Sequence, residues 1–223
     1  MSARSGEANE PRDKLNRGRV LHAAVDLADR SGIESLTMRE LGRSVGVEAA
    51  SLYNHVGGKD DLLDGMVELV VAEIDLPPAG GDWKDALRRR AVSAKQVFAR
   101  HPWAAALIDS RQHSGASSIA YADRVLDVLL SAGFGPQVAG IAFLVLDSYI
   151  YGFERQLSYL SMGEDLDTTE AAREVVEAIP AGELDALARV AEAFAGEPFD
   201  EHAAFEFGLD LLLDGLERLL PQS

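Results

Sequence analysis

Residues 36–59 read LTMRELGRSVGVEAASLYNHVGGK, and this stretch predicts two short helices joined by a tight turn. Thr37 stands three residues before a glutamate, the spacing of a capping box that satisfies free backbone N–H groups at a helix start. Gly46 predicts the end of that helix, because glycine adopts the left-handed conformation of a C-terminal cap without strain. Leu52 and Val56 lie one turn apart and are expected to face the core. Two helices joined in this way form a helix-turn-helix, an element that enters the major groove of DNA.

The second of these helices carries small and polar side chains, which suit contact with a DNA groove. Alanines allow a close approach and can touch a thymine methyl group, while hydroxyl and imidazole groups can donate to phosphate oxygens. Arg39 can reach a guanine edge through two hydrogen bonds, and Lys59 is placed for a phosphate. Glu48 suits the positive end of the helix dipole. We expect DNA contacts from Thr37, Arg39, Glu48, Ala49, Ala50, Ser51, Tyr53, Asn54, His55 and Lys59.

The same residues resemble the TetR family of bacterial repressors. The run LYNHV-x-x-K-x-x-L (52–62) is similar to the family's recognition-helix signature, and TMRELG (37–42) is similar to the preceding helix. Residues 19–33 match the first helix of the family, and FEFGLDLLLDGLE (205–217) resembles the tetracycline-repressor branch. The resemblance implies a homodimer that binds a palindromic double-stranded DNA operator and is released from it by a small-molecule effector.

Charge is distributed unevenly along the chain, whose net charge is −16. Residues 1–59 hold 9 basic and 8 acidic side chains, whereas residues 60–223 hold 12 and 29. The acidity therefore belongs to the C-terminal part, as expected for a separate sensing domain. The near-neutral N-terminal part predicts weak non-specific DNA binding, because few cations are available to displace counterions from DNA.

Other features of composition exclude several classes of protein. The chain contains no cysteine, so we expect neither disulfides nor thiolate metal sites. The N-terminus has no apolar segment typical of a signal peptide, and no apolar run is long enough to span a membrane. We therefore expect a cytoplasmic protein without a membrane partner.

Helical periodicity continues along the chain and no convincing strand pattern appears, so the predicted fold class is all-α. We expect a flexible arm over 1–15, a three-helix helix-turn-helix domain with a connector helix over 16–75, and a larger ligand-binding and dimerisation domain over 83–221. In the larger domain the predicted helices cover 83–100, 118–132, 136–160, 183–194 and 201–220, with residues 161–182 acidic and irregular. Arg12, Lys14, Arg17 and Arg19, in and beside the arm, suit phosphate or minor-groove contacts.

Two of these helices have the pattern of an oligomer interface. The last helix carries apolar residues at alternating spacings of four and three, which is a heptad seam. The long helix from Pro136 is apolar nearly all round between Val138 and Leu146, so it can serve both its own core and a partner. The alternative is that both helices only build the core of one protomer. We expect dimer contacts from Phe205, Leu209, Leu212, Leu216 and Leu219.

The ligand pocket is less well specified. The resemblance, aligned on Trp83, His101 and Gly152, implies that the two metal-binding positions of the tetracycline repressor fall on Ile108 and Gln156. Neither side chain suits a hard cation, so we expect no metal, no cofactor and an organic effector other than magnesium–tetracycline. Asp147 is costly in an apolar helix unless it is paired with Arg90, a cationic ligand or a group at the surface. The candidate lining is Arg90, Phe98, Trp103, Ile108, Phe143, Asp147 and Tyr151.

Three other functions are alternatives to this interpretation. An enzyme is not expected, because His113 and Ser114 are adjacent on a polar loop with no third orienting group. A small-molecule-binding or sequestering protein that kept the fold without operator binding is favoured only by the near-neutral DNA-facing part. A transcriptional activator is not distinguished from a repressor by the residues themselves.

Overall fold

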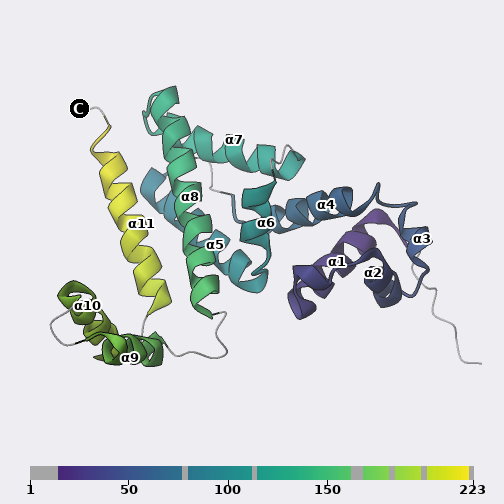
Figure 1. Cartoon of the computed structure of the whole chain (residues 1–223). Coiled ribbons are helices and arrows are strands. Elements are labelled where there is room, and N and C mark those ends of the chain that lie inside the picture. The colour runs from purple at the N-terminus through teal and green to yellow at the C-terminus, as the bar shows by residue number, and fades with distance from the viewer. Residues whose placement is uncertain are drawn as a thin grey trace, which may run out of the picture. The chain divides into compact units, whose positions relative to one another are not determined.

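The computed structural model describes residues 15–76, 80–111, 115–161, 168–180, 184–196 and 200–220. Every regular element in these ranges is a helix, which confirms the all-α prediction (Figure 1). None of the described helices is long and apolar enough to cross a membrane. The chain divides into two compact units, Met1–Leu69 and Val70–Ser223. The predicted arm up to residue 14 and the pair His113–Ser114 lie outside the described residues.

The first unit contains α1 (Arg17–Ser31), a 3-10 turn η1 (Ile33–Ser35), α2 (Met38–Val45), α3 (Ala49–Leu52) and most of α4 (Lys59–Ala72). The predicted caps of α2 are confirmed: the Thr37 hydroxyl accepts from the Glu40 amide at 3.1 Å, and Gly46 has φ 74°. A buried apolar core holds the helices together and includes Val20, Ala24, Leu36, Leu41, Leu52 and Val56.

The second unit contains α5 (Trp83–Arg100), α6 (Ala104–Ser110), α7 (Ala116–Ser131), α8 (Pro136–Ser161), α9 (Thr168–Ala178), α10 (Asp185–Gly196) and α11 (Glu201–Glu217). The long helix α8 is central, since α5, α6, α7 and α11 all pack against it. In Figure 1, α11 runs beside α8, and α9 and α10 form a separate pair of packed helices.

Helix α11 is held on α8 mainly by aromatic packing. The Phe205 ring stacks on Tyr149 with centroids 5.4 Å apart and meets Phe153 edge-on at 5.2 Å. The Tyr149 hydroxyl donates to the backbone carbonyl of Phe205 at 2.8 Å. The Lys84 ammonium on α5 also pairs with Asp214 of α11 at 2.8 Å. Because that pair is largely exposed on the α11 side, burial of the rings contributes more to the attachment.

Four details of the predicted helices are wrong. Helix α6 was not predicted, and α9 occupies part of the stretch 161–182 that was expected to be irregular. The acidic composition of that stretch hid a run of good helix formers, TTEAAREVVEA, which α10 stabilises by packing against it. Helix α3 is only four residues long, and α11 ends at Glu217 rather than at Leu220.

Candidate DNA-binding surface and ligand cavity

The turn between α2 and α3 brings the two helices into close contact at a glycine. A Cβ atom on Gly42 would lie 2.9 Å from the Val47 carbonyl oxygen and 3.1 Å from the Ala49 amide nitrogen. Both neighbours are backbone atoms, so a larger residue there would push α3 away from α2. The sequence-based prediction of the site did not include Gly42. A glycine inside an amphipathic helix is a signal of close packing that could have identified it.

The candidate DNA contacts lie on α2 and α3, at the N-caps of both helices, on the turn that follows α3 and at Lys59, the first residue of α4. None of the ten is buried: seven are exposed, and Ala49, Ser51 and His55 are half-buried. Although α3 ends at Leu52, the chain continues in a helical spiral, since the His55 amide donates to the Leu52 carbonyl at 2.8 Å. Tyr53, with 56% of its surface exposed, therefore projects from a turn and not from a long helix.

A group of ionic and backbone hydrogen bonds joins α1, α4 and this turn. The Arg17 guanidinium donates to both carboxylate oxygens of Asp61, at 2.6 and 2.7 Å, and to the backbone carbonyl of His55 at 3.2 Å. Asp61 also accepts from the Gly57 amide at 2.7 Å. The hydrogen bonds from Arg17, and then that from Gly57, lower the pKa of Asp61 to about 2. Arg17, one of the basic residues that suit phosphate or minor-groove contacts, pairs with Asp61 within the protein.

In the second unit, a cavity of about 400 Å³ opens between α6 and α8. Helix α6 contributes the apolar side chains of Ala105 and Ile108. Helix α8 contributes two ridges with a spacing of four residues, one through Leu144, Ser148 and Gly152 and the other through Asp147, Tyr151 and Arg155.

A buried ion pair lies behind the polar part of this wall. The buried Arg90 guanidinium from α5 donates to the Asp147 carboxylate and to the Tyr121 hydroxyl of α7. The sequence left several partners possible for Asp147, and in the structure it pairs with Arg90. The Arg90 Nη1 atom is buried and has no hydrogen-bond partner among the described residues. Burial raises the pKa of the Tyr151 phenol, so this hydroxyl stays protonated.

The structure brings three of the seven predicted pocket residues, Ile108, Asp147 and Tyr151, to the cavity wall. Arg90 and Phe98 lie one layer deeper: Arg90 pairs with Asp147, and the Phe98 ring packs on Tyr151 with centroids 5.4 Å apart. Trp103 and Phe143 do not line the cavity either. The prediction missed Ala105, Leu144, Ser148, Gly152 and Arg155, of which those on α8 follow from one-turn spacing around Asp147 and Tyr151.

The proposed dimer seam needs a correction, because Phe205 and Leu209 are 0% exposed within one protomer. These two residues pack inside the unit, as in the alternative reading of the heptad. Leu212 and Leu216 are half-buried, and Leu219 is exposed. An apolar surface groove of about 330 Å³ runs between α8 and α11 and is lined by Val138, Ile141, Ala142, Val145, Leu211, Leu212, Gly215, Leu216 and Leu219.

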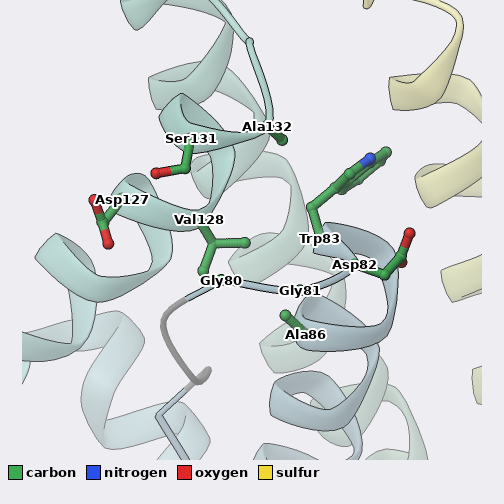
Figure 2. Close-up of a pocket in the computed structure, with 9 residues that line it drawn as sticks. All are labelled: Gly80, Gly81, Asp82, Trp83, Ala86, Asp127, Val128, Ser131 and Ala132. Atoms are coloured by element: carbon green, nitrogen blue, oxygen red, sulfur yellow. The ribbon is translucent and has the colours of Figure 1, made fainter.

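A third hollow, of about 320 Å³, lies where α5 begins and α7 ends (Figure 2). One side is formed by the start of α5 and the glycines before it, and the other by the end of α7; the lining residues are Gly80, Gly81, Asp82, Trp83, Ala86, Asp127, Val128, Ser131 and Ala132. Figure 2 shows the carboxylates of Asp82 and Asp127 on opposite sides of the view, where they do not converge on a common point. Asp82 already caps α5 by accepting from the Asp85 amide. The polar groups of this hollow therefore do not form a shared binding site.

Two family models match this chain, one within each unit. Residues 20–66 match the family model described as bacterial regulatory proteins, tetR family. Residues 76–220 match the model described as tetracyclin repressor-like, C-terminal domain.

Individual relatives extend over nearly the whole chain. The transcriptional repressor DrrR1 of Streptomyces coeruleorubidus is 33% identical over 95% of this chain and 81% of its own length. The class A tetracycline repressor from transposon 1721 of Escherichia coli is 32% identical over 92% of each chain. The TetR family protein ActR of Streptomyces coelicolor, solved with actinorhodin, shares the fold with a TM-score of 0.81 at 24% identity, over 94% of this chain and all of its own. These proteins are regulators and not enzymes, and the chain belongs to the TetR family of bacterial transcriptional regulators.

Proposed function

We propose that this regulator is a dimeric repressor that binds a palindromic operator through α2, α3 and the following turn, and that an organic effector in the α6–α8 cavity releases it. The observation that carries the proposal is the helix-turn-helix, whose close packing at Gly42 leaves every candidate DNA contact outside the core. Two such elements in a dimer must lie about 34 Å apart to enter successive major grooves on one side of DNA. An effector that favours another spacing weakens DNA binding by its difference in affinity for the two states.

Contacts inside the second unit support a route from the cavity to the connector helix. Glu73, directly after α4, accepts from the Arg100 guanidinium at 2.8 Å and lies 3.3 Å from the His101 imidazole. Hydrogen bonds from these two groups lower the pKa of Glu73 although burial opposes the shift. Arg100 and His101 lie just before α6, which supplies Ala105 to the cavity wall. A ligand that displaces α6 therefore acts close to the groups that hold the end of α4.

The cavity wall favours an organic molecule with a few polar groups. Its apolar surface comes from Ala105, Ile108 and Leu144, and its polar groups come from Asp147, Ser148, Tyr151 and Arg155. Asp147 is the single carboxylate in this lining, and Arg90 already pairs with it. A divalent cation needs several oxygen ligands, so this donor set does not fit a metal chelate.

The groove between α8 and α11 supports the dimer. Its exposed apolar residues include Ile141, Val145 and Leu211, at 55, 41 and 62% of their surface. Apolar side chains gathered on two adjacent helices are typical of a protein–protein interface, and a second copy provides the same surface for a symmetric four-helix contact. Leu212, Leu216 and Leu219 of the predicted seam line this groove.

Selection of random DNA duplexes by the purified protein tests the function directly. We expect an enriched palindrome with half-sites about one helical turn apart, because a symmetric dimer reads symmetric sites. No enriched sequence at either low or moderate salt would support instead a ligand-binding protein that lacks an operator.

Substitutions on the two sides of the helix-turn-helix should separate base contacts from phosphate contacts. Arg39→Ala should relax the preference at one base pair and cost about 1–3 kcal/mol on the operator alone. Lys59→Ala should weaken binding to all duplexes alike and reduce the salt slope by about one. Fluorescence anisotropy on operator and scrambled duplexes measures both, and an equal loss of affinity on every sequence would make Arg39 a phosphate contact.

Gly152→Leu should abolish the response to effector while leaving operator affinity unchanged. A Cβ atom on Gly152 has no neighbour within 4 Å, so the new side chain fills the cavity without disturbing the packed core. Gly140→Leu is the matched control, because Gly140 lies on the same helix, is equally open and does not line the cavity. The readout is release of labelled operator by compounds that release it from the unmodified protein. Release from Gly152→Leu at unchanged concentrations would place the effector elsewhere.

A further inference from the structure

The turn at residues 53–58 carries candidate DNA contacts, and backbone hydrogen bonds from Asn54, His55 and Val56 tie its first part to α3. Helix α3 before it has four residues and no side-chain cap. The turn ends in Gly57 and Gly58, which lack side chains to pack and have wide conformational freedom. On its inner side, Leu52 and Val56 are buried and anchor the turn to the core. Further contacts reach the His55 carbonyl and the Gly57 amide from outside the turn.

Those contacts come from Arg17 and Asp61. We propose that this pair is a positioning clamp that holds the turn in its DNA-binding shape, an inference that rests on the proposed operator function. Arg17 reaches the turn directly through the His55 carbonyl, at 3.2 Å, and Asp61 reaches it through the Gly57 amide, at 2.7 Å. The paired hydrogen bonds between the two side chains, at 2.6 and 2.7 Å, fix their mutual orientation.

The Arg17–Asp61 pair makes hydrogen bonds to the backbone of the turn that a simple ion pair would not require. A planar guanidinium can donate to both oxygens of a carboxylate and also to a carbonyl, whereas a lysine ammonium cannot reproduce this fork. The clamp thus spans three elements: α1 through Arg17, the turn through His55 and Gly57, and α4 through Asp61. Tyr53 and His55 lie on this turn and Lys59 directly follows it as the first residue of α4, so the relative positions of the three depend on the shape of the turn.

Removing the negative charge of Asp61 distinguishes the clamp from a plain electrostatic effect. If charge alone mattered, Asp61→Asn would strengthen DNA binding, because it removes a negative charge and frees the Arg17 cation for phosphate. The clamp instead predicts that Asp61→Asn weakens binding to the operator, because the turn loses its attachment to Asp61.

The experiment compares Asp61→Asn with Asp26→Asn in the full-length protein. Asp26 lies on the exposed side of α1, and its side chain makes no hydrogen bond or ion pair with any residue that the structure describes. Both variants change the net charge equally. For Asp61→Asn we expect about tenfold weaker binding to the selected operator, equivalent to about 1.4 kcal/mol, with unchanged or tighter binding to a scrambled duplex. Asp26→Asn should bind both duplexes as tightly as the unmodified protein or more tightly.

Arg17→Lys provides a second test that keeps the charge. The clamp predicts weaker operator binding with an unchanged salt slope, whereas an Arg17 that contacts phosphate would be replaced by lysine with little loss. Hydrogen exchange adds a readout independent of DNA, since the Gly57 amide should exchange faster in Asp61→Asn than in Asp26→Asn.

Two negative results have different meanings. An unmodified protein that selects its operator, together with an Asp61→Asn variant that binds it as tightly as Asp26→Asn does, would overturn the clamp alone. An unmodified protein that prefers no duplex would overturn the operator function, and the role of the clamp with it. Equal thermal stability of the two variants would show that lost operator affinity arises from the turn and not from unfolding.

Discussion

Asp147→Ala is expected to lower the free energy of unfolding by about 3–5 kcal/mol, because it leaves a fully buried guanidinium without its counter-charge. The Arg90 side chain is 0% exposed, and that of Asp147 is 13% exposed. After the substitution the Tyr121 hydroxyl is the remaining hydrogen-bond partner of the Arg90 side chain among the described residues, and a neutral hydroxyl does not offset a buried charge. Urea unfolding followed by tryptophan fluorescence measures the change, since Trp83 and Trp103 both lie in the second unit.

The control removes the charges together. The triple variant Arg90→Met, Tyr121→Phe, Asp147→Leu takes away both ions and the hydroxyl that would otherwise lose its partner, and it should recover most of the lost stability. Protein concentration must be equal in all experiments, because dimerisation also stabilises the fold. A loss below about 1 kcal/mol in Asp147→Ala would show that water or another group solvates Arg90.

The first unit could be predicted closely because its signals are local. Thr37 and Gly46 act on the backbone within a few residues, so their roles as caps follow from the sequence alone. The length of α3 did not follow in the same way. Whether the chain after Leu52 continues as a regular helix or as a looser spiral depends on the buried Val56 and on the glycines beyond it.

The cavity and the dimer surface could be predicted only in part, because both depend on which helices meet. The polar character of Asp147 in an apolar helix identified a special position, but only the packing of α5 against α8 shows that Arg90 is the partner. The heptad pattern of α11 identified an apolar face without showing what covers it. The Tyr149 ring covers Phe205 within the protomer, and the exposed part of the face lies at Leu211 and Leu219.

Leu211→Arg is expected to make the protein monomeric at micromolar concentration and to weaken operator binding by about 100-fold or more, since each half-site would then be bound without the other. Leu211 lines the apolar groove between α8 and α11 and is 62% exposed in the protomer. In a dimer the new guanidinium would be buried against apolar side chains with no counter-charge in the groove lining. In a monomer it remains in water, so the substitution disfavours only the dimer.

The direction of the change in DNA affinity distinguishes loss of the dimer from the effect of the added charge. An added arginine by itself strengthens attraction to DNA, so a large loss of affinity can arise only through the assembly. Leu130→Arg is the matched control, because Leu130 on α7 is also exposed and does not line the groove. Analytical ultracentrifugation gives the mass of each variant, and anisotropy gives its affinity for the full palindrome and for a single half-site. If Leu211→Arg is still a dimer with normal operator affinity, the interface lies on another surface. If it is a monomer that binds a single half-site as tightly as the unmodified protein does, α2 and α3 read DNA independently of assembly.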